Sequence, residues 1–513
     1  MNRSNDDASG RSIGSDFLQL DVADAPAGGL SEWLAARLRG AIADGRLPVG
    51  ARLPATRVLA AELEVSRGVV TEAYQRLAEV GQVVGRGRAG TIVVAAPVTA
   101  PPSTGGVAGS SSGAVALGGS PGSGAFGGGP GAAGSGGGAR SGVFDSEPGA
   151  DVFDRLRGAP ARIDLSPGVP DLAAFPRAAW LRAERSALAE LAAADLGYGD
   201  PRGVPVLRRA VADWLARNRG IRADPDEVVI VAGTAQALGL LAGILRADGI
   251  GTVAVEDPGS LGVRQHLRDS GMETPGVAVD SDGVRVDELH DSGAPAILLT
   301  PAHQFPTGVV LSGERRRGLM RWGGLIIEDD YDAEHRYDRT PVPALKSMLA
   351  EHVCYAGSVS KLLAPALRMG WVLVPPRYLD ALVAAKRFAD LGNAVLPQLV
   401  LARLMESGQL ERHLRSLRRR HRQRRDMMID AIRTHLPQAT VHGAAAGLHL
   451  MITFDGCQAD LDLAAAALEH GVKVQPLSWH SQRRALQGLV LGYAATSPSD
   501  IRDGVAVLGK LLS

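Results

Sequence analysis

The chain has 513 residues, and its 55 basic side chains balance its 55 acidic ones, which excludes a strongly charged polyelectrolyte. Hydrophobic residues make up 45% and charged residues 21%, which excludes disorder of the whole chain and allows a large buried core. Two cysteines, Cys354 and Cys457, exclude a disulfide framework and show no metal-ligand spacing with His; without an apolar span or a leader peptide, we expect a cytoplasmic protein with no membrane or metal site.

A small domain over residues 30–95 is expected after a disordered tail, residues 1–29. Apolar residues at helical spacing predict helices from Leu30 to Gly45, from about Pro54 to Glu64, and from a cap at Ser66 to Gly81. Two short strand patterns joined by an Arg-Gly-Arg turn follow. Three helices and a hairpin predict a winged helix-turn-helix.

Exposed polar residues of this small domain are candidates for contacts with double-stranded DNA. In a helix-turn-helix the second helix of the motif enters the major groove, and its first residues face the base edges. Residues 30–94 contain nine Arg and six acidic residues, a net charge of +3. That charge alone also suits a solvated face on a protein-binding domain. The candidates are Ser66, Arg67 and Thr71 for bases, and Arg57, Arg86 and Arg88 for phosphates or the minor groove.

Glycine is concentrated in a long connecting segment. Residues 97–139 contain 16 Gly and no charged residue, which is typical of a flexible linker. We assign the Gly/Ser/Ala/Pro linker to residues 96–155. A flexible chain of about 50 residues has a root-mean-square reach of roughly 40 Å, enough to carry one domain across a partner subunit.

The rest of the chain, residues 156–513, alternates apolar strand-like runs with amphipathic helical segments. This α/β alternation predicts a mostly parallel sheet flanked by helices, with ligands at the loops that follow the strands. The expected strands are Val228 to Ala232, Thr252 to Glu256, Ala296 to Thr300, Leu325 to Glu328, Val353 to Ala356 and Trp371 to Val374.

Only five of the 55 basic residues are lysines, which shortens the search for a reactive amine. A Schiff-base cofactor such as pyridoxal 5'-phosphate needs a lysine anchored at a strand end, groups that hold a phosphate, and a carboxylate for the pyridine nitrogen. Lys361 alone follows a predicted buried strand and a small-residue turn, residues 357–360. Lys361 is therefore the candidate for the covalent bond.

The other groups that this cofactor needs follow neighbouring strands. Ser358 and Arg368 flank Lys361 and suit a phosphate, and Gly233-Thr234 opens a helix whose amides can hold the same anion. Asp329 could bond the pyridinium nitrogen and Tyr331 the phenolic oxygen. Each motif alone is weak evidence for a cofactor site. Their occurrence together, in this order along the chain, is stronger evidence.

These motifs resemble two known families. The patterns Leu53-Pro54-Ala55-Thr56-Arg57, Val65-Ser66-Arg67 and Gly85-Arg86-Gly87-Arg88 are similar to the GntR-type winged helix. Those around residues 198–203, 256–259, 300–308 and Lys361 are similar to fold-type I aminotransferases. Together these patterns make the chain resemble the MocR family of transcriptional regulators, which includes the PdxR branch that controls vitamin B6 synthesis.

The resemblance implies pyridoxal 5'-phosphate bound as an internal aldimine in a head-to-tail, domain-swapped homodimer. It implies a sensor of a small-molecule effector, either the cofactor or an amine that reacts with it. Lys361 would carry the cofactor, Asp329 would face N1 and Tyr331 would face O3'. Phosphate would be bound by Ser358, Arg368 and the Gly233-Thr234 amides, with Tyr198 reaching it from the other subunit. His303 and Gln304 lie where aminotransferases place the loop that flanks the ring.

The sequence departs from the aminotransferase pattern at two positions that bear on whether the chain is an enzyme or a regulator. Ser260 replaces an aromatic residue, which leaves open the side chain that stacks on the ring, and Val490 replaces the arginine that clamps a substrate carboxylate. We therefore expect a regulator and not primarily an enzyme. The alternatives are an aminotransferase acting on an amino acid and a 2-oxo acid, and a metabolite-binding module without covalent cofactor. The Arg-rich helix, residues 411–433, suits either a second DNA contact or an exposed helix of the body.

Overall fold

The computed structural model describes most of the chain outside the N-terminal tail and the long linker. The described residues are 18, 20, 22–26, 29–44, 46–85, 90–94, 142–144, 147–337, 342–455, 459–483 and 487–512. Arg86, Arg88 and Cys457, like most of the predicted tail and linker, lie outside these ranges. No helix among the described residues has the length and apolar character needed to span a membrane.

The N-terminal domain is a winged helix-turn-helix, as predicted. Its elements are α1 (Leu30–Ala43), α2 (Thr56–Glu62), α3 (Arg67–Glu79), β1 (Val83–Gly85) and β2 (Thr91–Val93), and the two strands pair antiparallel. Leu34, Leu38, Leu59 and Leu77 are buried together in its core. The hydroxyl of Tyr74 donates to the carbonyl oxygen of Pro54 at 2.8 Å, which ties α3 to the chain that enters α2.

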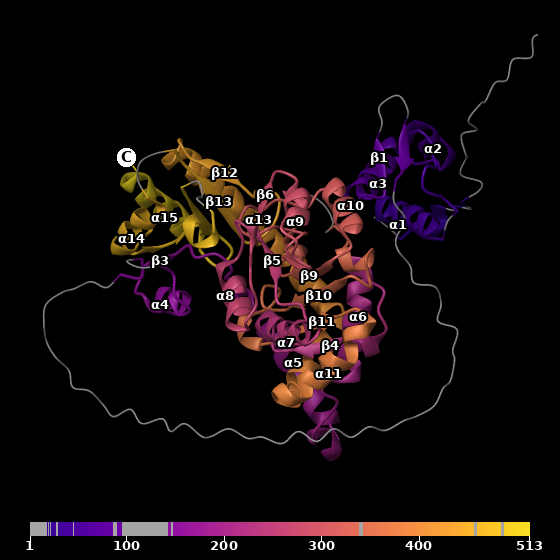
Figure 1. Cartoon of the computed structure of the whole chain (residues 1–513), viewed down its shortest axis with the longest axis horizontal. Helices are drawn as coiled ribbons and strands as arrows, with labels where there is room; N and C mark the ends of the chain where they lie inside the picture. Colours follow the sequence, from indigo (N-terminus) through magenta and orange to yellow (C-terminus); the bar gives the residue numbers. More distant parts are fainter. Residues whose placement is uncertain are drawn as a thin grey trace, which may run out of the picture.

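An eight-stranded mixed sheet forms the centre of the body, in the order β4-β11-β10-β9-β8-β5-β6-β7 (Figure 1). Its strands are β4 (Val229–Val231), β5 (Val253–Asp257), β6 (Gly276–Asp280), β7 (Gly283–Val284), β8 (Ala296–Leu299), β9 (Leu325–Asp330), β10 (Val353–Ser358) and β11 (Gly370–Leu373). Pairing is parallel from β10 to β6, whereas β11 and β7 are antiparallel to their neighbours. The predicted strands are therefore confirmed, and most of the sheet is parallel.

Helices cover both faces of this sheet, because its central strands are apolar on both sides. Helices α7, α8 and α11 bury side chains against one face, and α6, α10 and α12 against the other. The helices that flank the sheet are α5 (Arg177–Glu190), α6 (Pro205–Arg219), α7 (Thr234–Ala247), α8 (Leu261–Asp269), α9 (Val286–Asp291), α10 (Gly313–Trp322), α11 (Pro376–Asp390) and α12 (Val395–Glu406).

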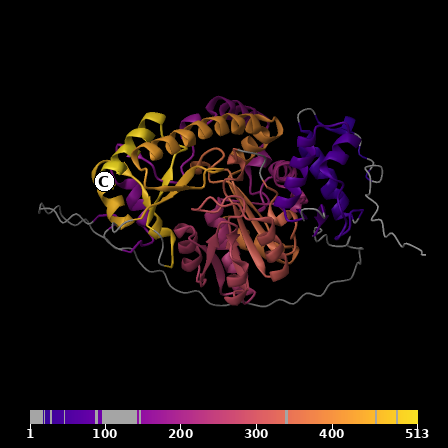
Figure 2. The same ribbon diagram turned by 90° about the horizontal axis from the view of Figure 1, so that it is seen from above.

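A second, smaller core lies at the C-terminal end of the body. A four-stranded antiparallel sheet, in the order β12-β13-β16-β15, packs with α13, α14 and α15, and α13 runs across the body (Figure 2). The elements are α13 (Gln409–His435), β12 (Thr440–His442), β13 (His449–Thr453), α14 (Asp460–Glu469), β15 (Gln475–Pro476), β16 (Gly488–Gly492) and α15 (Pro498–Leu511), with β3 (Ile163–Asp164) paired to β14 (Val472–Lys473). A further helix, α4 (Val152–Gly158), joins this core and begins inside the linker predicted for residues 96–155.

The N-terminal domain contacts the body where α3 ends. Arg317 of α10 donates to the carbonyl oxygen of Gly81 at 3.2 Å. A Cβ placed on Gly81 would lie 2.6 Å from the carbonyl oxygen of Gly313, so only a residue without a side chain allows this approach. The first residues of α3, which are the candidate base readers, lie at the other end of the helix.

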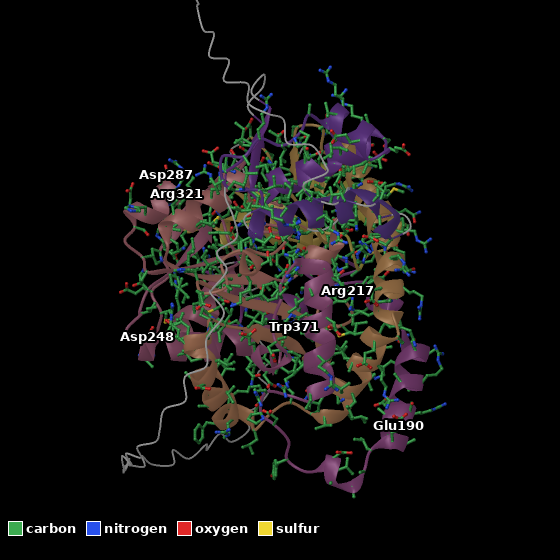
Figure 3. The ribbon with its side chains drawn as sticks, turned by 90° about the vertical axis from the view of Figure 1, so that its right-hand side faces the viewer. Glu190, Arg217, Asp248, Asp287, Arg321 and Trp371 are labelled. Carbon is green, nitrogen blue, oxygen red and sulfur yellow. The ribbon has the colours of Figure 1, made fainter. Side chains whose placement is uncertain are left out.

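A buried ion pair supports the middle of the large sheet. Arg219, at the end of α6, donates to the carboxylate of Asp330 at 2.5 Å, and both side chains are almost fully buried. The hydroxyl of Tyr355 on β10 donates to the same carboxylate at 2.5 Å. Arg217, two residues before Arg219, instead lies on the outer face of the body, whereas Trp371 lies among the strands (Figure 3). Asp330 ends β9, so this pair holds the strand end that carries Asp329.

Replacing Arg219 with Met should lower the free energy of unfolding by about 3 to 5 kcal/mol, because it leaves the Asp330 carboxylate buried without its cation. The matched control is Arg217→Met on the same helix, whose side chain is 56% exposed and should cost less than about 1 kcal/mol. Urea unfolding followed by circular dichroism measures both. Equal losses in the two variants would contradict this role of Arg219.

Candidate cofactor site and DNA-binding surface

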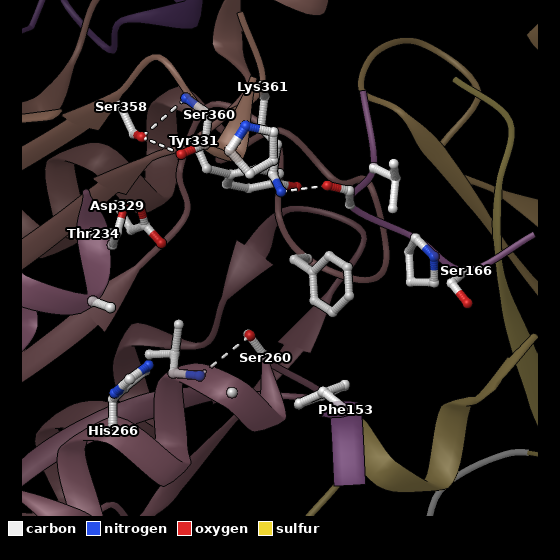
Figure 4. Close-up of a pocket in the computed structure, with 18 of the residues that line it drawn as sticks. Phe153, Ser166, Thr234, Ser260, His266, Asp329, Tyr331, Ser358, Ser360 and Lys361 are labelled. Atoms are coloured by element: carbon white, nitrogen blue, oxygen red, sulfur yellow. Dashed lines mark hydrogen bonds between the residues drawn. The ribbon is translucent and has the colours of Figure 1, made fainter. Parts of the chain in front are cut away.

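A cavity of about 620 Å³ lies at the carboxyl ends of the central strands, where α/β sheets place ligands (Figure 4). Six of the predicted cofactor residues line it together: Thr234, Asp329, Tyr331, Ser358, Lys361 and Arg368. They come from four separate segments of the chain. The sequence order of the motifs thus corresponds to one place in the fold.

Lys361 is the only lysine that lines this cavity among the described residues. Its amine donates to the carbonyl oxygen of Gly168, and a ring nitrogen of His335 lies 3.0 Å from the Lys361 carbonyl oxygen. Burial lowers the pKa of Lys361, while the carboxylates of Asp332 and Asp329 oppose this change. A lowered pKa increases the fraction of neutral amine, the form that attacks a carbonyl carbon.

An anion-binding cradle occupies one end of the cavity. Gly233 precedes α7 with a φ of 81°, a conformation that favours glycine, and leaves the first amides of α7 facing the cavity. A Cβ on Gly233 would lie 3.3 Å from a guanidinium nitrogen of Arg368. The hydroxyl of Ser358 lies 2.8 Å from that of Ser360, and both residues line the cavity. A helix N-terminus, a guanidinium and two hydroxyls together suit a phosphate group.

The carboxylate of Asp329 has an oxygen with no partner. Asp329 lies at the end of β9, is 7% exposed, and its Oδ1 makes no hydrogen bond within the described structure. Burial raises its pKa to about 7, and the neighbouring carboxylate of Asp330 adds to the effect. A buried carboxylate without a partner is costly unless a cationic ligand group completes it. A protonated pyridine nitrogen is such a group.

Tyr331, His303 and Asp332 form a hydrogen-bonded group beside the cavity. The Tyr331 hydroxyl lies 3.1 Å from the His303 carbonyl oxygen and 3.0 Å from its Nδ1, and that Nδ1 lies 2.9 Å from Asp332 Oδ2. Tyr331 lines the cavity but His303 and Gln304 do not. Gln304 instead donates to the carbonyl oxygen of Pro258 at 2.9 Å and holds the loop. Of the two predicted loop residues, neither reaches the cavity in the single chain.

Tyr198 and Val490 lie outside the cavity for different reasons. Tyr198 is 93% exposed, and within one chain it does not line the cavity. Val490 is fully buried on β16, where Met451, Leu477 and Phe305 pack around it. The place where an aminotransferase arginine is expected is therefore filled by an apolar cluster.

Several residues that line or support the cavity were not predicted. Ser360 directly precedes Lys361, and its hydroxyl could have been inferred from the same Ser-Val-Ser-Lys run. Thr300 donates to the buried carboxylate of Glu256 at 2.6 Å, which joins the ends of β8 and β5. Phe153 of α4 also lines the cavity, although it falls within the predicted linker. No sequence signal marks Phe153, because its contact depends on tertiary packing.

Four of the six predicted DNA contacts are exposed residues of the N-terminal domain. Ser66, Arg67, Thr71 and Arg57 are all exposed. Ser66 has the position and extended backbone of an N-cap, but its side chain makes no capping hydrogen bond. The Arg67 Nε lies 3.4 Å from the Thr56 hydroxyl, which places its guanidinium beside α2. Contact of these four residues with DNA stays a prediction, and Arg86 and Arg88 lie outside the described residues.

Two arginines of the Arg-rich helix α13 form ion pairs inside the body. Arg420 and Arg424 both pair with the buried carboxylate of Asp171, at 2.7 and 2.9 Å. Asp171 follows the loop whose Gly168 carbonyl accepts the Lys361 amine. Arg412, Arg415, Arg419 and Arg422 are exposed. Through Asp171, the helix therefore supports the loop beside the cavity. A second DNA contact through its exposed arginines stays a prediction.

Asp329→Asn should stabilise the cofactor-free protein. The pKa of Asp329 is raised from 3.8 to about 7, so the native state binds the extra proton between these values. Wild-type stability should therefore fall as pH rises from about 4 to 7, by at most about 4 kcal/mol. The variant should unfold at a higher temperature than wild type at pH 8, and this difference should be less than half as large at about pH 5 and absent below about pH 4. An exposed control, Asp282→Asn, should change neither; a variant no more stable than wild type at pH 8 would contradict the assignment.

Comparisons with known proteins identify a related family for each of the two domains. Residues 30–93 match the bacterial regulatory proteins of the gntR family, and residues 161–505 match aminotransferase class I and II. The probable rhizopine catabolism regulatory protein MocR of Rhizobium meliloti is 32% identical, over 91% of each chain.

A second relative matches most of the chain, and a protein of known structure matches the body. The pyridoxine biosynthesis transcriptional regulator PdxR of Corynebacterium glutamicum is 28% identical over 94% of this chain and 95% of its own. An archaeal alanine:glyoxylate aminotransferase of known structure superposes with a TM-score of 0.64 and 26% identity, covering 72% of this chain and 95% of its own. The chain therefore belongs to the MocR-type transcriptional regulators, in which a GntR-type helix-turn-helix precedes an aminotransferase-like domain.

Proposed function

We propose that this regulator binds pyridoxal 5'-phosphate at Lys361 and that occupancy of the site controls its binding to DNA. The observation that carries the proposal is the buried Asp329 carboxylate with an unpartnered oxygen, in the same cavity as Lys361 and the anion cradle. The aminotransferase-like fold supports the same cofactor. The cofactor would supply an aldehyde that reacts with amines and a pyridine ring that withdraws electrons.

The residues of this chain have separate tasks in holding the group. Lys361 would bind it covalently through Nζ, and Asp329 would keep a proton on the ring nitrogen. Arg368, Ser358, Ser360 and the first amides of α7 would hold the phosphate, and the Tyr331 hydroxyl would meet the phenolic oxygen. His303 orients that hydroxyl through its Nδ1, which also contacts the carboxylate of Asp332.

The substrate end of the cavity favours a sensor over an aminotransferase. The arginine position is apolar, with Val490 packed against Phe305. Burial lowers the pKa of His480, which lines the cavity, to about 3, so its imidazole is neutral near pH 7. Arg157 lines the cavity too, but its side chain is 73% exposed and pairs with Asp154. Among the described residues, no buried cation is placed to fix a substrate carboxylate.

The proposal extends to the effector, the assembly and the location of the protein. The effector is the cofactor itself or an amine that reacts with it, and control of vitamin B6 metabolism is supported by the relative named for pyridoxine biosynthesis. Two chains form a head-to-tail, domain-swapped homodimer in which the exposed Tyr198 of each reaches the phosphate of the other. The protein acts in the cytoplasm, because a regulator must reach the chromosome.

Wild-type protein with pyridoxal 5'-phosphate should show visible absorbance, and its dissociation constant for DNA selected from a random-sequence library should change on addition of the cofactor. Lys361→Ala should lose the absorbance and the change together, because the covalent bond is gone. Lys510→Ala, a lysine outside the cavity, is the control. An unchanged DNA affinity in the wild type would contradict the sensor role. Repeated turnover of an amino acid and a 2-oxo acid would favour the aminotransferase alternative.

Arg67→Ala should weaken binding to the selected DNA by about 5- to 100-fold, which corresponds to one specific base contact of about 1 to 3 kcal/mol. Arg46→Ala, exposed in the turn after α1 and paired with Asp44, should bind as the wild type does. Electrophoretic mobility shifts at one fixed salt concentration measure both. Equal affinities of Arg67→Ala and wild type would remove Arg67 from the reading surface.

A further inference from the structure

Residues 142–144 and 147–158 lie between the two matched families yet are part of the body. The gntR match ends at residue 93 and the aminotransferase match begins at residue 161. Within the intervening chain, α4 buries Val152 and Leu156 in the core of the smaller sheet. Gln265 of α8 donates to the carbonyl oxygen of Gly149 at 2.8 Å. Among the described residues, this segment therefore packs on the body before the aminotransferase match begins.

Two aromatic residues fix this segment to one tryptophan. Phe144 stacks on Trp479 with ring centroids 5.2 Å apart, and Phe153 meets the same ring edge-on at 6.1 Å. Trp479 is 2% exposed and precedes His480, which lines the cavity. Aromatic pairs of this kind stabilise a contact by about 0.5 to 1.5 kcal/mol beyond the area they bury. The anchor of the segment is thus one residue away from the cavity wall.

The same segment also forms part of that wall. Phe153, Leu156 and Arg157 all line the cavity, and Phe153 is next to Ser260 at one edge while Lys361 lies across it (Figure 4). A Cβ on Gly262 would lie 3.6 Å from the Phe153 ring. The Ser260 hydroxyl accepts from the amide of Val263 at 3.4 Å, so this side chain caps α8 and offers no ring. The aromatic wall on this side comes from α4.

We propose that Phe153 contacts the molecule bound in the cavity and that binding there orders α4. The proposal rests on the proposed function, because it takes pyridoxal 5'-phosphate as that molecule. A ligand that packs against Phe153 stabilises α4, which is anchored on Trp479.

The coupling has a simple energetic basis. A seven-residue helix is too short to be stable alone, so α4 depends on the contacts it makes with the body. Part of its apolar surface faces the cavity and not the core, and a bound ligand covers that part. Ligand binding and ordering of α4 therefore favour each other, and such linkage is reciprocal.

Phe153→Ala in the full-length protein tests the contact directly. We expect it to keep the Lys361-dependent absorbance at saturating pyridoxal 5'-phosphate, while the dissociation constant for the cofactor rises at least threefold. Phe388→Ala is the matched control, since that ring is 88% exposed and outside the cavity. An unchanged dissociation constant in Phe153→Ala, or loss of the absorbance even at saturating cofactor, would overturn the proposal.

A second measurement needs no variant and guards against misfolding. Hydrogen exchange of the amides of residues 152–158 in the wild-type protein should slow when pyridoxal 5'-phosphate is added. Normal cofactor absorbance with unchanged exchange there would overturn this inference alone. Absence of any Lys361-dependent absorbance would instead contradict the proposed function on which it rests.

Discussion

The cavity depends on a carboxylate that is buried without a partner for one of its oxygens. Asp329 is held at the end of β9, in the middle of a sheet whose strands are apolar on both faces, and burial raises its pKa to about 7. The chain tolerates this cost because the next residue, Asp330, is fixed by Arg219 and Tyr355, so the strand end cannot move away. Stability spent in this way is typical of a binding site, where a ligand supplies the missing partner.

The other features of the cavity are arranged around that carboxylate. Lys361 follows the neighbouring strand β10, and the anion cradle combines the start of α7 with Arg368, which a glycine at position 233 allows to come close. Outside the cavity lining, Val490 occupies the position expected for a substrate-binding arginine and packs against Phe305. Under the proposed function, the arrangement of Lys361, Asp329 and Arg368 without such an arginine favours a protein that detects the cofactor.

Sequence patterns predicted the two domains, the main strands and the residues that line the cavity from strand ends, because local motifs such as Ser-Val-Ser-Lys and Glu-Asp-Asp-Tyr carry their chemistry with them. They failed for tertiary contacts. Phe153 has no motif, and the Ser66 cap lacks its hydrogen bond. His303 and Gln304 do not line the cavity in one chain, and their roles toward the cofactor stay predictions. Tyr198 illustrates a different limit, since its predicted role needs a second chain. The pairing of α13 arginines with Asp171 also depends on residues about 250 positions apart.

The scarcity of lysine makes the central claim accessible to one measurement. Reduction of the wild-type protein with borohydride in the presence of pyridoxal 5'-phosphate, followed by peptide mass spectrometry, locates any covalent attachment. The account predicts the pyridoxyl mass on Lys361 and on none of Lys346, Lys386, Lys473 or Lys510. An unmodified Lys361, or modification at another lysine instead, would contradict it.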